Sequence, residues 1–393
     1  MSKKILIIAS DFPYPPNHGG RVDVFERIKV LKSLDYQVSL VSTIKTQPNK
    51  DEMSYMENFI EDNLLIKRRQ SIFDLFSCKP YQVTSRNNHK DIKVVLKNIR
   101  NETFDACIVE GHYGLDLFES INRSCNINKK YLRVHNDERK YFKELAKSTN
   151  NILKKIFYYL ESIKFSYYEK NFFKKNIIKA CLHVSDDEYK IYKNNYQFIN
   201  HIFLPASVDV NDFKKYTKKN NKTVLFIGSL FMPNNIEGLM WYLKNIHNNL
   251  CKIFQDYNLV IAGNSKGFDV QSFIETLNKF TNIIFYDSPE NLDDLYLESC
   301  VFINPMLSGA GVKLKTINAV KYGLPIVSTE IGNEGTGLIH KSHLLVAKND
   351  NDFLQHMIHL LEDESLRNSL VLNAQRFLLE NYNQTKNLWG LIR

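Results

Sequence analysis

The sequence lacks long apolar runs. Its 393 residues contain no uninterrupted apolar stretch near the roughly 18 residues that a membrane-spanning helix needs. The opening KKILIIAS supplies only about half of a signal-peptide core before Asp11 interrupts it. We therefore expect a cytoplasmic protein, in which any association with the inner face of the plasma membrane is made by surface residues.

Cysteine is sparse as well. None of the six cysteines forms a C-x-x-C pair, and several lie inside apparent strands or helices, as reduced core thiols do. The His, Cys and Asp residues show no clustered spacing of the kind that metal ligands have. We therefore expect neither a disulfide scaffold nor a metal site. The cysteines are Cys78, Cys107, Cys125, Cys181, Cys251 and Cys300.

One common cofactor motif is missing. The first strand is not followed by G-x-G-x-x-G, which argues against a dinucleotide-binding oxidoreductase. The net charge of +9 instead favours an anionic partner, such as a phosphate-bearing ligand, an acidic membrane or a nucleic acid. Because no recognised nucleic-acid motif accompanies the charge, we expect no nucleic-acid partner.

Short β-branched runs alternate with helical patterns along the whole chain, which predicts an α/β protein with parallel sheets covered on both faces. The lysine-rich run 214–222 precedes a fresh strand, TVLFIG, so we place a domain break before it. The predicted domains are 1–208 and 209–380. The apolar tail 381–393 is predicted to be a helix that crosses back to the first domain.

A glycine loop precedes a predicted helix in the second domain. Ser308, Gly309, Ala310 and Gly311 allow close backbone approach, and two lysines, Lys313 and Lys315, follow within about one turn. A pyrophosphate here would meet amides, the helix dipole and two ammonium groups. The alternative is an ordinary loop with solvated lysines.

The same helix stops at Gly323 and carries Asn318 on the side of Lys315, where its amide can hold a ligand hydroxyl or can be a plain surface group. A second glycine-rich turn after the next strand brings Glu334 to the same sheet edge. Glu334 is therefore a candidate acceptor for the sugar side of a ligand.

In the first domain, Gly19 and Gly20 stand at the start of a helix and offer amides to an anion or a sugar hydroxyl. His135 and Asn136 follow a predicted strand, so they are expected at its carboxyl end. A histidine there either hydrogen-bonds a ligand or is structural.

Residues 151–179 interleave lysines with phenylalanines and tyrosines. A helix of this composition suits the surface of an anionic bilayer, where each lysine contributes about 1 kcal/mol. It equally suits a long helix that packs on one face and is solvated on the other.

Taken together, these segments resemble glycosyltransferase family 4, the retaining sugar transferases of the GT-B fold. The resemblance covers nearly the whole chain, and its most specific part is GAGVKLKTINAVKYGLPIVSTEIGNEGTGL. Other parts are SDFPYPPNHGGRVDVFERIKVLKSL, RVHNDERKYF, ASVDVNDF and GSLFMPNN. It implies two Rossmann-like domains whose parallel sheets face a central cleft, with the C-terminal helix crossing back to the first domain.

The resemblance also implies site roles. His135 would touch the transferred sugar, and Lys313, with Lys315 beside it, would neutralise the diphosphate leaving group. Gly19 and Gly20 would line the donor or acceptor side. The remaining implied substrate contacts are Asn136, Gly228, Ser229, Asn234, Ser308, Gly309, Ala310, Gly311, Asn318 and Glu334.

Two positions depart from the family pattern. Asn318 stands where the family usually has the glutamate that holds the nucleotide ribose, and Ser308 stands near the other carboxylate position. An amide still bonds ribose hydroxyls but loses the charge-assisted strength of a carboxylate. The departure leaves donor affinity, donor choice and activity itself open.

The implied activity is transfer of a sugar from a nucleoside-diphosphate sugar to a glycan, free or lipid-linked, in bacterial cell-surface polysaccharide or glycoconjugate synthesis. It needs no cofactor, and no D-x-D stands in the place where metal-dependent transferases of the other major fold carry one. Two alternatives remain: a non-catalytic partner subunit of the same fold, suggested by Asn318, and a nucleotide-sugar epimerase, for which no convincing acidic set is found.

Overall fold

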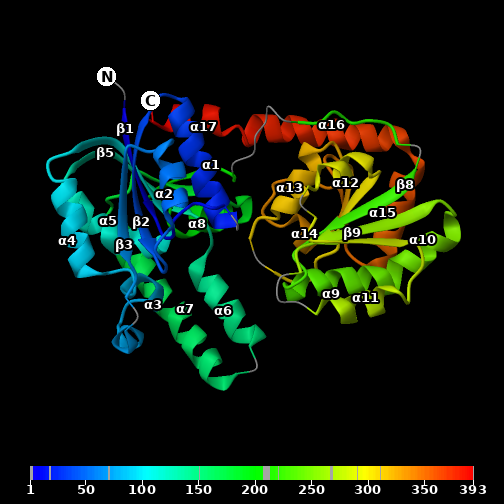
Figure 1. The fold of residues 1–393 in the computed structure, drawn as a ribbon, viewed down its shortest axis with the longest axis horizontal. Helices are drawn as coiled ribbons and strands as arrows, with labels where there is room; N and C mark the ends of the chain where they lie inside the picture. Colours follow the sequence, from blue (N-terminus) through cyan, green and yellow to red (C-terminus); the bar gives the residue numbers. More distant parts are fainter. Residues whose placement is uncertain are drawn as a thin grey trace. The chain divides into compact units, whose positions relative to one another are not determined.

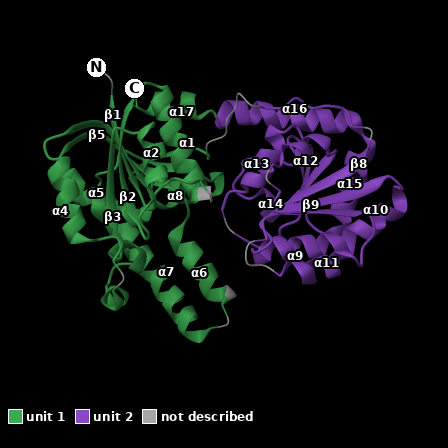
Figure 2. Ribbon diagram, in the orientation of Figure 1, with its two compact units in different colours: residues 1–208, 383–393 green, residues 209–382 purple. Residues whose placement is uncertain are grey.

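The computed structural model describes residues 3–16, 19–69, 71–149, 151–206, 213–219, 221–265, 269–289, 291–309 and 311–392. The chain forms two compact units (Figure 2), unit 1 with Met1–Val208 and Asn383–Arg393, and unit 2 with Asp209–Tyr382. The predicted domain break between residues 208 and 209 lies within 207–212, outside the described residues.

Unit 1 is built on a seven-stranded sheet in the order β3-β2-β1-β4-β5-β6-β7, with every pair parallel (Figure 1). Its strands are β1 (Lys4–Ala9), β2 (Gln37–Ile44), β3 (Asp62–Lys67), β4 (Thr103–Glu110), β5 (Asn126–Val134), β6 (Ala180–His183) and β7 (Asn200–Phe203). Because side chains alternate along a strand, β1 serves two cores. Ile5 and Ile7 pack on one face, and Leu6 and Ile8 on the other.

Helices cover both faces of this sheet. Helix α1 and the C-terminal α17 share the core of Ile5 and Ile7, whereas α5 and α7 share that of Leu6 and Ile8. The helical segments are α1 (Gly19–Ser33), α2 (Lys50–Glu57), η1 (Ile72–Phe76), α3 (Tyr81–Thr84), α4 (His89–Asn98), η2 (His112–Gly114), α5 (Leu115–Asn122), α6 (Glu138–Ser148), α7 (Ile152–Phe173), α8 (Asp186–Asn195) and α17 (Gln384–Ile392).

Unit 2 has a six-stranded parallel sheet in the order β10-β9-β8-β11-β12-β13. Its strands are β8 (Lys222–Ile227), β9 (Tyr257–Gly263), β10 (Ile283–Asp287), β11 (Val301–Asn304), β12 (Ile326–Thr329) and β13 (Leu345–Ala347). Its helical segments are α9 (Pro233–Tyr242), η4 (Leu243–His247), α10 (Asn248–Ile253), α11 (Val270–Leu277), α12 (Asp293–Glu298), α13 (Leu314–Lys321), α14 (Glu330–Asn333), α15 (Asp350–Glu362) and α16 (Glu364–Asn381).

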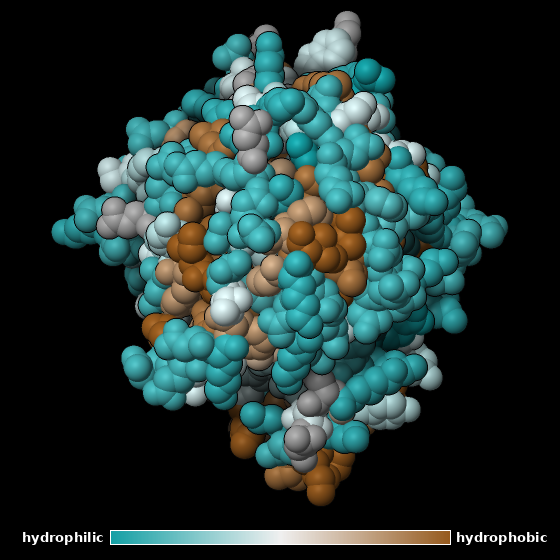
Figure 3. All heavy atoms as spheres, turned by 90° about the vertical axis from the view of Figure 1, so that its right-hand side faces the viewer, coloured by the Kyte–Doolittle hydropathy of each residue, from teal (hydrophilic) through white to brown (hydrophobic). Residues whose placement is uncertain are grey.

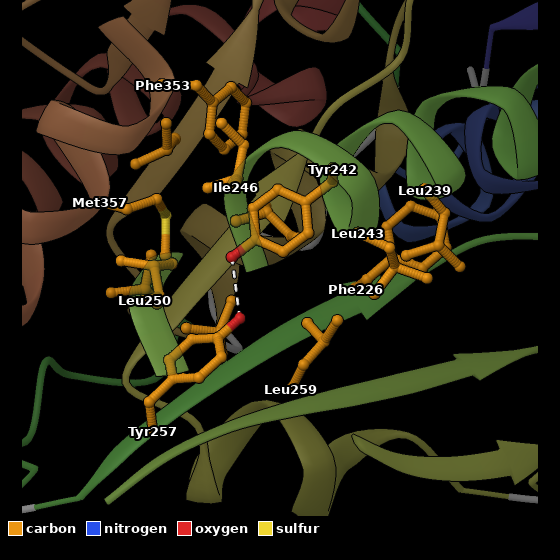
Figure 4. Close-up of a cluster of buried hydrophobic side chains, with 14 of the residues drawn as sticks. Phe226, Leu239, Tyr242, Leu243, Ile246, Leu250, Tyr257, Leu259, Phe353 and Met357 are labelled. Carbon is orange, nitrogen blue, oxygen red and sulfur yellow. Dashed lines mark hydrogen bonds between the residues drawn. The ribbon is translucent and has the colours of Figure 1, made fainter. Parts of the chain in front are cut away.

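The core of unit 2 contains two buried tyrosines among aliphatic side chains (Figure 4). Their hydroxyl groups lie 3.0 Å apart, from Tyr242 of α9 and Tyr257 of β9. This hydrogen bond satisfies polar atoms that would otherwise be costly to bury. It lets the end of α9, at Tyr242, pack closely on the sheet.

The predicted parallel α/β architecture is confirmed, although two of its strands lack the apolar run that marks a buried strand in a sequence. β3 and β13 lie at sheet edges. β3 opens with the polar pair Asp62-Asn63, and β13 has only three residues, so neither shows a buried apolar run. The helix predicted within 151–179 is shorter than that segment, because α7 ends at Phe173 and Asn176 adopts a φ of +50°.

The C-terminal helix crosses back to unit 1, as predicted. Leu388 and Ile392 of α17 are buried in its core, and the Tyr131 hydroxyl donates to the Leu391 carbonyl oxygen at 2.8 Å. Trp389 of the same helix is exposed. Among the described residues, no helix combines the length and apolar character needed to cross a membrane.

Candidate functional site

In unit 2, the glycine loop closes around the ammonium group of Lys313. Its Nζ donates to the carbonyl oxygens of Gly311 at 2.7 Å and Gly309 at 3.3 Å, and it lies 3.2 Å from Oε2 of Glu334. The Lys313 side chain is only 5% exposed. The reading as a solvated lysine is therefore wrong for Lys313, which joins the loop to the turn after α14.

Lys313 immediately precedes α13, and Lys315 lies in its first turn. The Lys315 Nζ donates to Oδ1 of Asn235 at 2.8 Å and lies 5.1 Å from the ring centroid of Phe226. Burial lowers the pKa of Lys315 to about 7, and the nearby charge of Lys313 acts in the same direction. A bound anion would favour its charged form.

The loop after β8 lies against the glycine loop. The Asn235 side chain donates to the Ser229 carbonyl oxygen at 3.0 Å, and a Cβ on Gly228 would lie 3.0 Å from that side chain. Gly309 has a φ of +116°, and a Cβ there would come within 2.7 Å of Nδ2 of Asn234. Glycine is therefore required at Gly309 by both conformation and space.

Asn235 was missed by sequence reasoning, although it is the second asparagine of GSLFMPNN. Glu237 was also missed. It accepts a hydrogen bond from the Ser308 hydroxyl at 2.8 Å, which gives the loop a carboxylate although Ser308 itself has none. Asn318 is exposed on α13, one turn beyond Lys315. Ala310 lies outside the described residues.

A buried asparagine holds this region together. Nδ2 of Asn304, at the end of β11, donates to Oγ1 of Thr316 at 2.9 Å and to the Gly332 carbonyl oxygen at 2.7 Å. The Thr316 hydroxyl also donates to that carbonyl oxygen, at 2.8 Å. These bonds fix α13 and α14 at the carboxyl edge of the sheet, where ligands bind in open parallel sheets.

In unit 1, His135 follows β5 and faces two carboxylates. Its Nε2 lies 2.9 Å from Oε2 of Glu110, which ends the neighbouring strand β4, and its Nδ1 lies 4.0 Å from Oδ2 of Asp23 on α1. The ring is partly exposed. These contacts orient the His135 ring.

Two fully buried arginines neutralise these carboxylates. Arg27 donates from Nε to Glu110 at 2.7 Å and also bonds Asp23, while Nε of Arg133 donates to Asp23 at 3.1 Å. Burial alone would raise the pKa of Asp23, but the charges of Arg133 and Arg27 outweigh it and lower that pKa. Burial would likewise raise the pKa of Glu110, and Arg27 and His135 lower it. Both acids therefore stay ionised near neutral pH.

The other predicted residues of unit 1 lie around this network. Helix α1 begins at Gly19 and Gly20 is exposed, one turn before Asp23. Asn136 is half-buried beside Asp137, whose side chain caps α6 by accepting from the Lys140 amide at 2.9 Å. Sequence reasoning missed Asp23 and the three partners Arg27, Glu110 and Arg133. The available signal was Glu110 at the end of a predicted strand.

Two groups of metal-ligand side chains assemble in unit 1, although their sequence spacing gave no sign of it. One is Asp23, Glu110 and His135, whose acids bond the two arginines. The other is Cys181, His183 and His201, in which Nε2 of His183 lies 2.8 Å from Nδ1 of His201. The expectation of no metal ligand stays a prediction.

Comparison with known proteins shows the family to which the chain belongs. Residues 221–363 match the family described as Glycosyl transferases group 1. The chain is 35% identical over 393 residues to an uncharacterized 44.6 kDa protein in the cps region of Klebsiella pneumoniae, covering 98% of this chain and 97% of that protein. The chain belongs to the group 1 glycosyltransferases, that is, glycosyltransferase family 4.

Solved structures show the same GT-B fold. The chain is similar to a TarM variant from S. aureus in complex with UDP, with a TM-score of 0.67, 12% identity and 100% of both chains covered. It is also similar to HepE from Anabaena in complex with UDP and glucose, with a TM-score of 0.63, 10% identity, 99% of this chain and 98% of that chain covered. The predicted family and fold are confirmed.

Proposed function

We propose that this glycosyltransferase is a retaining, metal-independent enzyme that moves a sugar from a nucleoside-diphosphate sugar to a glycan acceptor in cell-surface polysaccharide synthesis. The observation that carries the proposal is the pair of lysines, Lys313 and Lys315, at the glycine loop of unit 2. The related protein of a cps region supports a role in capsule synthesis. The UDP bound by TarM and HepE supports a nucleotide donor.

In the proposed reaction, the bond between the anomeric carbon and the diphosphate breaks, and the diphosphate leaves with the electron pair. Lys313 and Lys315 stabilise the charge that develops on it. The acceptor hydroxyl attacks from the face that the diphosphate leaves, so the configuration is retained, and its proton passes to the departing phosphate oxygen. His135, held by Glu110, bonds the transferred sugar.

Helix α7 supports a second part of the proposal, peripheral contact with an anionic membrane through residues 151–179. One face of α7 is buried, and the opposite face carries an exposed apolar stripe. Figure 3 shows apolar side chains at the low end of the molecule, where Figure 1 places the turn between α6 and α7. The stripe comprises Ile152, Leu153, Ile156, Tyr159, Leu160, Ile163 and Tyr167.

Exposed lysines beside this stripe indicate what kind of surface it binds. Lys154, Lys155 and Lys170 are exposed on the same helix, and Lys140, Lys143 and Lys147 are exposed on α6. An apolar stripe beside clustered lysines suits the interface of an anionic bilayer, where burial of apolar side chains and attraction to lipid phosphates act together. We place this surface at the inner face of the plasma membrane.

A binding screen tests the donor site. Purified protein is titrated with UDP, GDP, ADP, TDP and CMP by calorimetry, with Lys313→Ala in parallel. Selective binding of one nucleoside diphosphate that the variant loses would support the proposal and name the base. Absence of binding by every nucleotide would instead favour the non-catalytic partner subunit that Asn318 suggested.

A further inference from the structure

Two arginines of unit 1 that the proposed chemistry does not use lie at the carboxyl edge of its sheet. Arg86, which follows α3, is only 6% exposed. It donates to the Ser10 carbonyl oxygen at 3.2 and 3.3 Å and to the Gln82 carbonyl oxygen at 2.6 Å. Arg68, just after β3, donates to the Gln82 side chain at 3.3 Å and to the Ser85 hydroxyl at 3.1 Å.

All these acceptors are neutral. Among the described residues, no carboxylate forms an ion pair with Arg68 or Arg86, whereas their neighbour Arg69 pairs with Asp74 at 2.9 Å. Burial lowers the pKa of Arg86 to about 9, and the charge of Arg68 acts in the same direction. A buried arginine beside a half-buried one, neither with an ion-paired carboxylate, is costly, so the pair is suited to accept an anion.

Nearby acids already have other partners. Asp11 bonds Nε of Arg21 at 2.8 Å, and Glu138 accepts from the Tyr113 hydroxyl at 2.5 Å. The Tyr113 ring lies 4.7 Å from the guanidinium carbon of Arg86, and this contact holds the guanidinium plane in place. Among the described residues the arginine pair therefore has no ion-pairing carboxylate of its own, and the Tyr113 ring fixes the orientation of Arg86.

The pair adjoins the surroundings of His135. Ser10, which accepts from Arg86, donates its own hydroxyl to the Glu110 carbonyl oxygen at 2.9 Å. A Cβ on the next residue, Gly111, would lie 3.8 Å from the Ser10 hydroxyl and 3.7 Å from the His135 ring. An anion on the arginines would thus lie within a short distance of the residue assigned to the transferred sugar.

An exposed apolar turn begins three residues after Arg69. In η1, Phe73 is 80% exposed and Phe76 is 83% exposed. The turn is attached to the lipid-facing helix, because Nζ of Lys164 on α7 donates to the Leu75 carbonyl oxygen at 3.0 Å. One arginine of the pair, Arg68, and the exposed phenylalanines thus lie on one short segment, which contacts α7 at Lys164.

We propose that Arg68 and Arg86 bind the phosphoryl group of a lipid-linked acceptor, whose hydrocarbon chain lies along η1 and α7. The paired guanidinium groups can donate hydrogen bonds to the oxygens of a phosphate or diphosphate, and the exposed phenylalanines can contact the hydrocarbon chain of the acceptor. This inference rests on the proposed function, since it names the acceptor class of that transferase.

The test uses inorganic pyrophosphate and farnesyl diphosphate as probes, titrated calorimetrically into the full chain. The background is Lys313→Ala with Lys315→Ala, which removes the lysines of the donor loop. We expect both probes to bind. We expect Arg68→Gln and Arg86→Gln each to weaken pyrophosphate binding by about tenfold, as loss of a charged hydrogen bond does. The matched control is Arg69→Gln in the same background, and it should bind both probes as tightly as the background protein does.

Equal pyrophosphate affinity in all these variants would overturn the site. Because Arg86 is buried, the half-buried Arg68 keeps the test valid if Arg86→Gln fails to fold. Farnesyl diphosphate should bind more tightly than pyrophosphate, and Phe73→Ser with Phe76→Ser should remove that gain. Equal affinity for the two probes would contradict the lipid part of the proposal. The phosphoryl group would then belong to a water-soluble glycan acceptor.

These experiments distinguish failure of the acceptor inference from failure of the proposed function. With the native lysines present, Arg68→Gln should leave nucleoside-diphosphate affinity unchanged. If no nucleotide binds but both probes still bind at the arginines, the donor proposal fails and the anion site stands. If a nucleotide binds and neither probe does, the acceptor inference fails alone.

Discussion

The ammonium group of Lys313 lies 3.2 Å from a carboxylate oxygen of Glu334. The ion pair joins the glycine loop before α13 to the turn after α14, and its lysine also bonds two carbonyl oxygens of the loop. Charge-assisted bonds of this kind hold a cation where a diphosphate can meet it without reorganisation.

Removing that cation should abolish most of the activity. We expect Lys313→Ala to lower kcat about 100-fold, as loss of one group that stabilises transition-state charge does. Lys321→Ala, in the last turn of the same helix, is the control and should keep full turnover. Steady-state release of nucleoside diphosphate measures both, and an unchanged rate in Lys313→Ala would remove this lysine from the mechanism.

Lys315 should make nucleotide binding depend on pH. Its pKa of about 7 in the free protein lies below the ordinary value of 10.5, so it is largely neutral at pH 8. A bound diphosphate favours the ammonium form and raises that pKa, so binding takes up a proton and affinity falls as pH rises above 7.

Calorimetry at pH 8 in two buffers of different ionisation enthalpy measures this uptake. It should approach one proton per nucleotide and disappear in Lys315→Met. The same uptake in the variant would show that another group takes up the proton.

The family resemblance implies a carboxylate at position 318, and a substitution can introduce it there. Asn318 is exposed on α13, so Asn318→Glu should fold normally. If the residue meets the ribose hydroxyls, a charge-assisted bond replaces a neutral one, and nucleoside-diphosphate affinity should rise by about three- to tenfold. The control is Asn318→Gln, which keeps the amide. Equal affinity in all three proteins would show that this position does not contact the ribose.

The buried charges of unit 1 should matter for stability. Arg133→Leu leaves Asp23 with one of its two arginines, and we expect it to lower the free energy of unfolding by about 3 kcal/mol. Arg123→Leu, at an exposed arginine, should change it by less than about 0.5 kcal/mol. Urea denaturation measures the free energy of unfolding of both variants and of the native chain. Equal stabilities would mean that Arg27 alone compensates Asp23.

The apolar stripe of α7 should control vesicle binding. We expect Leu153→Ser with Ile156→Ser to remove most cosedimentation with anionic vesicles, because burial of each side chain contributes roughly 1.5 to 3 kcal/mol and a loss of about 3 kcal/mol lowers the affinity more than 100-fold. The control is Leu372→Ser on α16, also exposed but on unit 2. Equal cosedimentation of the double variant and the native chain would show that this surface does not contact the membrane.

The sequence predicted the parallel architecture and the position of the glycine loop because both depend on local patterns. Runs of β-branched residues mark strands, and Gly309 and Gly311 mark the loop. The partners of these residues could not be predicted. Glu110 meets His135 only because two parallel strands end at one edge of the sheet, and Arg86 meets the Ser10 carbonyl oxygen only because the loop after α3 lies at that edge. Such contacts depend on strand order, which local patterns do not contain.

The most direct test of the central claim is a transfer assay. The native chain and Lys313→Ala are incubated with labelled nucleoside-diphosphate sugars and a glycolipid fraction from cells that make the protein, and label in the lipid phase is measured. We predict that one donor labels the lipid, with the configuration at its anomeric carbon retained, and that Lys313→Ala lowers the rate about 100-fold. Absence of transfer from every donor, with the protein folded, would contradict the assignment of an active transferase.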